Sequence, residues 1–91
     1  MDNKESIPTS VEPRPIHIIA REIRNDWGKQ IYFGAVPYLH AMASLEDMNS
    51  IYHADTADSI VLYFLSNAQT WRGETARRVK AELRNMLKGK R

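Results

Sequence analysis

The sequence contains no cysteine, which excludes disulfide bonds, thiolate metal ligands and thiol nucleophiles. It also has no apolar run of about 18 residues, the length that a membrane-spanning helix needs. The opening stretch, MDNKESIPTSVEPRP, lacks the apolar segment of a secretory signal peptide. These absences predict a cytoplasmic protein with no membrane contact, held together by a hydrophobic core.

Catalytic and metal-binding motifs are also lacking. The four glycines never cluster into a phosphate-binding loop, and no serine stands in the context of a nucleophile elbow. No two histidines have the four-residue spacing of a helical metal site; they are His17, His40 and His53. The acidic residues between positions 46 and 58 miss the spacing of an EF-hand. We therefore expect no enzyme activity, no metal ion and no cofactor.

Apolar residues make up 43% of the 91 positions, enough for one small core. Their spacing predicts an all-α fold, a compact single domain of about four helices over residues 13–91. Residues 1–12 are rich in proline, hydroxyl and charged side chains and have little to bury. We predict that they form a mobile tail that the domain does not need for stability.

The first helix is predicted to begin at Pro13 and Pro15, because proline is tolerated in the first turn. Gly28 marks its end. Its apolar stripe recurs at three- and four-residue spacing and contains Ile16, Ile19, Ala20, Ile23 and Trp27.

A second helix covers roughly residues 30–45. Pro37 disfavours a helical residue before it, so the helix either starts near Val36 or bends there. We favour the late start, with IYFG at residues 31–34 as an irregular or one-turn segment that packs its aromatic side chains. Residues 46–55 then form a polar connection, with expected anchors at Met48, Ile51 and Tyr52.

Asp55 or Thr56 is expected to cap a third helix. The run IVLYFL is also compatible with a buried strand, but its flanks carry no hairpin signal and no partner strand is evident. Because Leu62 and Tyr63 add apolar character to a second face, we expect this helix to be the most enclosed element. Its main apolar face contains Ile60, Val61, Phe64, Leu65 and Ala68.

The final helix is predicted from about Glu74 to Lys88, after a turn that contains Gly73. Its inward stripe contains Ala76, Val79, Leu83, Met86 and Leu87. Residues 60–91 hold eight Lys or Arg and two Asp or Glu, which gives a net charge of +6. Residues 1–59 hold five Lys or Arg and nine Asp or Glu, which gives a net charge of −4. This asymmetry indicates either a nucleic-acid site or two parts that face each other.

One flank of the final helix carries a stripe of cations suited to a row of phosphates: Arg77, Lys80, Arg84, Lys88 and Arg91. The short turn before the helix resembles that of a helix-turn-helix motif, but antiparallel helix pairs use loops of the same length. Moreover, Glu74 places an acid at the end that a recognition helix normally offers to the bases. Basic residues at the other end complement the helix dipole. A solvated, stabilising face is the preferred interpretation, and nucleic-acid binding is the alternative.

Surplus apolar side chains indicate a surface that a partner could cover. Its predicted members are Tyr38, Met42, Leu62 and Tyr63. The expected function is that of a small helical protein-interaction module, which binds an unknown protein partner or forms a homodimer. Near the end of the third helix, Asn67 and Trp71 either line a pocket or serve in packing, and packing is preferred.

Two stretches, YFGAVPYLHAM and SIVLYFLSNAQTWRGETARRVKAEL, resemble a family of small helical proteins from phages and prophages of Gram-positive bacteria. The similarity covers about residues 16–87. The resemblance implies a helical fold and a phage or mobile-element origin. It implies no activity and no site residues.

Overall fold

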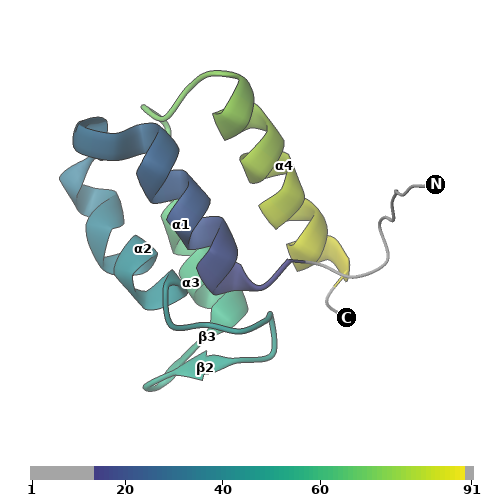
Figure 1. The fold of residues 1–91 in the computed structure, drawn as a ribbon. Helices are drawn as coiled ribbons and strands as arrows, with labels where there is room; N and C mark the ends of the chain where they lie inside the picture. The colour runs from purple at the N-terminus through teal and green to yellow at the C-terminus, as the bar shows by residue number, and fades with distance from the viewer. Residues whose placement is uncertain (1–13, 90–91) are drawn as a thin grey trace.

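Four α-helices and a small β-hairpin follow one another along the chain (Figure 1). The computed structural model describes residues 14–89, so the predicted tail, Pro13 and Arg91 lie outside the described residues. The predicted all-α fold of four helices is confirmed. The elements in chain order are α1 (Ile16–Trp27), the 3-10 helices η1 (Gly28–Gln30) and η2 (Phe33–Ala35), α2 (Val36–Met42), the strands β2 (Ile51–Tyr52) and β3 (Asp55–Thr56), α3 (Ala57–Ser66) and α4 (Glu74–Gly89).

Helix α1 lies where the sequence predicts it, and all five residues of its apolar stripe are buried. Pro15 precedes it in an extended conformation, with φ −57° and ψ 142°. No side chain caps this end; instead the backbone N–H groups of Ile16 and His17 donate to the carbonyl oxygens of residues 46 and 45, both at 3.0 Å. Carbonyl oxygens of the loop after α2 thus accept hydrogen bonds from backbone N–H groups that have no partner within the first turn of a helix. Gly28 ends the helix with φ 60°, a conformation that glycine adopts without strain.

Helix α2 begins at Val36, which confirms the late start, and Pro37 occupies its first turn. It ends at Met42, three residues earlier than predicted. The expectation that the preceding segment packs its aromatic side chains is wrong for Phe33, which is 79% exposed. The reason is local, because the tight turn of η2 directs Ala35 into the core and leaves Phe33 outside.

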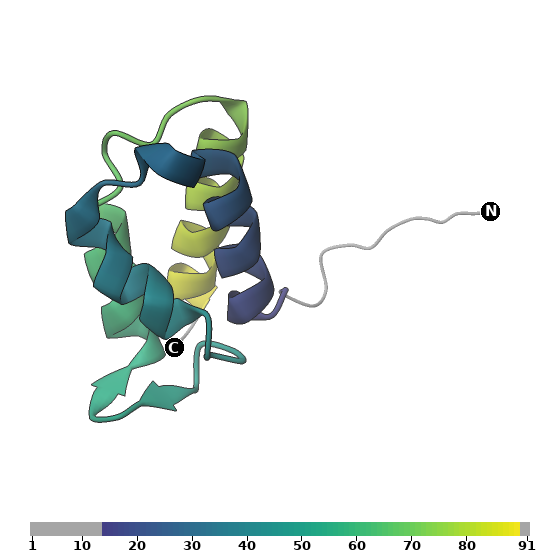
Figure 2. The ribbon, with the colours of Figure 1, turned by 60° about the vertical axis from the view of Figure 1, so that its left-hand side comes forward.

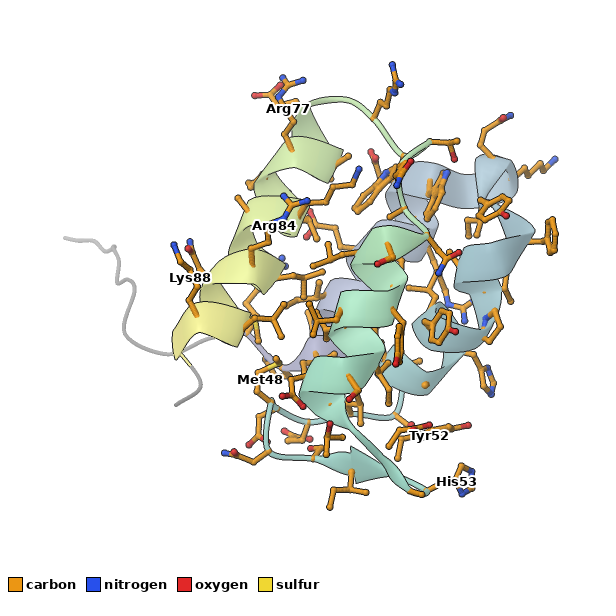
Figure 3. All side chains as sticks on the ribbon, turned by 180° about the vertical axis from the view of Figure 1, so that it is seen from behind. Met48, Tyr52, His53, Arg77, Arg84 and Lys88 are labelled. Atoms are coloured by element: carbon orange, nitrogen blue, oxygen red, sulfur yellow. The ribbon has the colours of Figure 1, made fainter. Side chains whose placement is uncertain are left out.

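The connection between α2 and α3 contains a two-stranded antiparallel hairpin that the sequence did not predict. Met48 is buried and Tyr52 packs against the core, as expected. Ile51 was expected to be an anchor and is instead 66% exposed, because neighbouring residues of a strand point to opposite sides. The tip carries His53 at φ 57°, next to Tyr52 (Figure 3). Thr56 then caps α3 by accepting a hydrogen bond from the backbone N–H of Ser59.

The core lies between two helix pairs, with α1 beside α4 and α2 beside α3 (Figure 2). Its largest side chains form an aromatic cluster in which the Trp27 and Trp71 rings stack at 5.7 Å and Phe64 stands edge-on to both. The expectation that α3 is the most enclosed element is wrong. Leu62 is 53% exposed and Tyr63 is 56% exposed, because α3 buries one face and leaves the opposite face uncovered.

Ion pairs join α1 to α4 and place part of the acidic front of the chain against the basic helix. Arg14 binds Glu82 through two hydrogen bonds of 2.9 and 2.7 Å and reaches Glu22 at 2.8 Å. Glu22 also pairs with Arg78. Hydrogen bonding from Arg78, and then from Arg14, lowers the pKa of Glu22 below its ordinary value.

This network should make stability depend on pH in the acid range. Because the pKa of Glu22 is lower in the folded chain, its contribution is complete above the ordinary value of about 4.5 and is lost as pH falls through the folded pKa. We expect Glu22→Gln to cost about 1 kcal/mol at neutral pH and to flatten the acid loss of stability, measured by urea unfolding between pH 7 and pH 3. An unchanged slope in Glu22→Gln would contradict this role.

Candidate functional site

The predicted basic stripe on α4 is interrupted at Lys80. Its Nζ donates to the backbone carbonyl oxygen of Trp71 at 2.6 Å and lies 5.8 Å from the centre of the Trp71 ring. Burial lowers the pKa of Lys80, and the positive charges of Arg84 and Arg72 lower it further. Lys80 therefore holds the turn before α4 in place and is unsuited to a row of phosphate contacts.

The other described members of the stripe, Arg77, Arg84 and Lys88, are exposed along α4 (Figure 3). Arg91 lies outside the described residues. Arg78, which the stripe did not include, is held by Glu22 of α1. Of the four predicted cations that the structure describes, three thus lie on an open helix surface.

A shallow, open groove lies between α3 and α4. Its apolar part consists of three leucines and one alanine, and two cations lie on its α4 side. The residues that define it are Leu62, Leu65, Ala81, Arg84, Leu87 and Lys88, joined by the uncharged polar residues Ser66 and Asn85. We call this feature the α3–α4 groove. Among residues 14–89 no acidic side chain lines it, so the described lining combines apolar surface with positive charge.

A second surface lies over η2, α2 and α3. The rings of Tyr32 and Phe33 are 5.0 Å apart, and those of Tyr38 and Tyr63 are 5.6 Å apart. Asn67 connects the two pairs: its Nδ2 donates to the Tyr63 carbonyl oxygen at 2.9 Å, and its Oδ1 lies beside Gly34, against which Tyr32 folds. We define the aromatic surface as Tyr32, Phe33, Val36, Tyr38 and Tyr63.

Glycine at position 34 leaves room for the Tyr32 ring, which a larger residue would displace. A Cβ atom there would lie 2.4 Å from the ring of Tyr32 and 3.0 Å from Oδ1 of Asn67. Such a contact with the ring is too short for any side chain, so the backbone of Gly34 gives the room in which Tyr32 and Asn67 meet. The sequence shows the YFG string at residues 32–34. How its residues pack against Asn67 is seen only in the three-dimensional structure.

The predicted partner surface is divided by the structure. Leu62 and Tyr63 are both exposed, but Leu62 lines the α3–α4 groove whereas Tyr63 belongs to the aromatic surface with the half-buried Tyr38. Met42 is fully buried, so its assignment to a partner surface is wrong. It lies three residues after Leu39 on α2, and this spacing turns both side chains into the core.

The preferred packing role of Trp71 agrees with its position. Its side chain is 2% exposed, and its Nε1 donates to Oδ2 of Asp26 at 2.9 Å. Asn67 bonds the backbone of its own helix. Leu65 and Leu87, expected in the core, are only partly buried because they also line the groove. The sequence analysis missed the groove, although it had named five of its residues in separate roles: Leu62, Leu65, Arg84, Leu87 and Lys88.

The chain matches no protein-family model, no curated protein and no solved structure. Within residues 14–89, no group of three metal-ligating side chains is positioned to hold an ion. In the same part of the chain, every helix is too short or too polar to cross a membrane. Function is therefore inferred from the two surfaces themselves.

Proposed function

We propose that this chain is a small protein-interaction module that self-associates through its aromatic surface. The observation that carries the proposal is the gathering of five uncharged side chains, four of them aromatic, outside the core. Phe33 is 79% exposed, Tyr63 56% and Val36 45%. Isolated apolar residues are normal on a protein surface, but two partly exposed pairs of aromatic rings, both beside Asn67, are typical of a contact site.

The chemistry of these residues favours a protein as the bound partner. Aromatic side chains are enriched at the buried centres of protein interfaces, where they contribute much of the binding energy. Tyrosine suits such a position because its ring packs against apolar atoms while its hydroxyl group tolerates water. The ring pair of Tyr38 and Tyr63 already holds part of the surface in a fixed arrangement before any partner binds.

A second copy of the chain fits this surface because it carries no charge. In a twofold dimer the same patch meets itself, so charged residues in it would oppose like charges. The α3–α4 groove would suffer this repulsion through Arg84 and Lys88, whereas the aromatic surface would not. Five side chains are few compared with a stable interface of about 20–30 residues per partner, so we expect a weak, reversible dimer.

Nucleic-acid binding is the less supported proposal. Lys80 is engaged by the Trp71 carbonyl oxygen, which reduces the candidate phosphate contacts among the described residues to Arg77, Arg84 and Lys88. Three contacts correspond to a log–log salt slope of about −2.7 on duplex DNA. The apolar groove beside Arg84 and Lys88 also differs from the polar surface that phosphates favour.

Replacing both Phe33 and Tyr63 with serine should weaken self-association by about tenfold or more, because each removes a large aromatic contact. Sedimentation velocity over a wide concentration range measures this shift. The control is Leu62→Ser, which alters a residue of similar exposure on the same helix but outside the aromatic surface. A wild-type chain that stays monomeric at every concentration, or equal weakening by the control, would contradict the proposal.

Three further expectations from the sequence stay predictions. They are a cytoplasmic location, a phage or mobile-element origin, and the lack of enzyme activity. A binding module requires none of them, and the aromatic surface supports the proposal independently of all three.

A further inference from the structure

The α3–α4 groove lies apart from the aromatic surface and shares no residue with it. Leu62 is 53% exposed at the groove, so about half of its side chain is open to a partner. Arg84 and Lys88 are spaced four residues apart on α4, so they lie one above the other on one flank. The groove thus has an apolar stripe, and one of its two sides is positively charged.

We propose that the α3–α4 groove binds an acidic amphipathic α-helix of a partner protein. This is a second binding activity, beyond self-association through the aromatic surface. The partner helix would place apolar side chains on Leu62, Leu65 and Leu87, and acidic side chains one turn apart beside Arg84 and Lys88.

A helix suits the groove better than an extended peptide. Both walls are α-helices, whose backbone groups bond within each helix and leave no strand edge for a peptide to pair with. A bound segment must therefore satisfy its own backbone, as a helix does. From Ala81 to Lys88 the α4 wall is about 10 Å long, the length of two helical turns.

The charge of the groove selects an acidic partner. None of the described lining residues is acidic, and the nearby Glu82 is bound by Arg14 on the side of α4 that faces α1. Burial lowers the pKa of Lys80, and the positive charges of Arg84 and Arg72 nearby lower it further, so several cations lie on this side of α4. Carboxylates at a spacing of three or four residues would match Arg84 and Lys88 and exclude basic partners.

The leucines argue against nucleic acid as the occupant of this groove. Interfaces with nucleic acid are more polar than those with proteins, and phosphate contacts come mainly from cations and hydrogen-bond donors. A phosphate backbone would cover the three leucines without making favourable apolar contacts with them. An amphipathic helix uses both the leucines and the cations.

The test uses the full chain and a fluorescein-labelled synthetic peptide of about 14 residues. The peptide carries leucine at three- and four-residue spacing and glutamate on the flanking positions; a scrambled peptide of the same composition is its control. Fluorescence anisotropy at physiological salt should give saturable binding of the amphipathic peptide and at least about tenfold weaker binding of the scrambled one. Shifts in the NMR methyl signals of Leu62, Leu65 and Leu87 should report the contact.

Reversing both groove charges, with Arg84→Glu and Lys88→Glu, should weaken peptide binding by at least about tenfold, and Leu62→Gln should weaken it several-fold. Arg77→Glu makes the same kind of charge change on α4 outside the groove and should have little effect. Tyr63→Ser should leave peptide binding intact, so failure of self-association and failure of this proposal are distinguishable.

Three results would overturn the proposal. One is equal binding of the scrambled peptide, which would show attraction by charge alone. Another is an equal effect of Arg77→Glu. The third is tighter, saturable binding of a DNA duplex at physiological salt that Arg84→Gln weakens while flattening the salt slope by about one unit. That third result would assign the groove's cations to nucleic acid.

Discussion

Replacing Phe64 with alanine should lower the free energy of unfolding by about 3–5 kcal/mol. Phe64 is fully buried, and its ring lies edge-on to Trp27 at 6.3 Å and to Trp71 at 6.5 Å. The substitution removes both aromatic contacts and leaves a cavity beside the stacked indole rings, which cannot move to fill it without losing their own stacking. Because small domains have stabilities of about 5–15 kcal/mol, a large part of the total would be lost.

Urea unfolding followed by circular dichroism measures this loss. Tyr63→Ala is the matched control, since it truncates an aromatic side chain at the preceding position of α3 that is 56% exposed. The control should cost about 1 kcal/mol or less. Similar costs for the two variants would mean that the buried face of α3 does not form the centre of the core.

Helix positions could be predicted because the apolar periodicity of the sequence is regular where a helix packs on one side only. The stripe of α1 from Ile16 to Trp27 and that of α4 from Ala76 to Leu83 are both buried as expected. Local signals were equally reliable, since Gly28 and Thr56 act as the predicted helix ends. These features depend on residues within a few turns of one another, which a sequence displays directly.

The exposed surfaces could not be predicted in the same way. Leu62 and Tyr63 are as apolar as core residues, and their sequence does not show that α3 leaves that face open. Composition led us to expect a more enclosed helix, whereas the arrangement of α2 and α4 around α3 decides which face is covered. Apolar character alone therefore does not separate core residues from contact residues.

The hairpin and the position of Lys80 were missed for related reasons. Strands of two residues, Ile51–Tyr52 and Asp55–Thr56, are too short to display an alternating pattern. Lys80 falls in the helical stripe by spacing, but its amine reaches back nine residues to the Trp71 carbonyl oxygen. That contact depends on the path of the turn between α3 and α4, which helical periodicity does not describe.

Replacing Trp71 with alanine should also cost about 3–5 kcal/mol, because Trp71 joins three parts of the molecule. Its buried ring stacks on Trp27 at 5.7 Å, its Nε1 donates to Asp26 at the end of α1, and its ring lies beneath the amine of Lys80 on α4. Losing the ring removes the stacking partner of α1 and the apolar anchor of the turn before α4. The loss should appear in urea unfolding followed by circular dichroism.

The separate contribution of the hydrogen bond can be measured with Trp71→Phe. Phenylalanine keeps an aromatic ring over Trp27 but has no donor for Asp26, so this variant should lose much less stability than Trp71→Ala. Combining Trp71→Phe with Asp26→Ala in a double-mutant cycle should give a coupling energy of about 1 kcal/mol. Coupling near zero would show that the 2.9 Å contact between Nε1 and Oδ2 adds nothing to stability. In that case the stacked ring alone would hold the turn against α1, and Trp71→Phe would lose only the stability that its smaller ring costs.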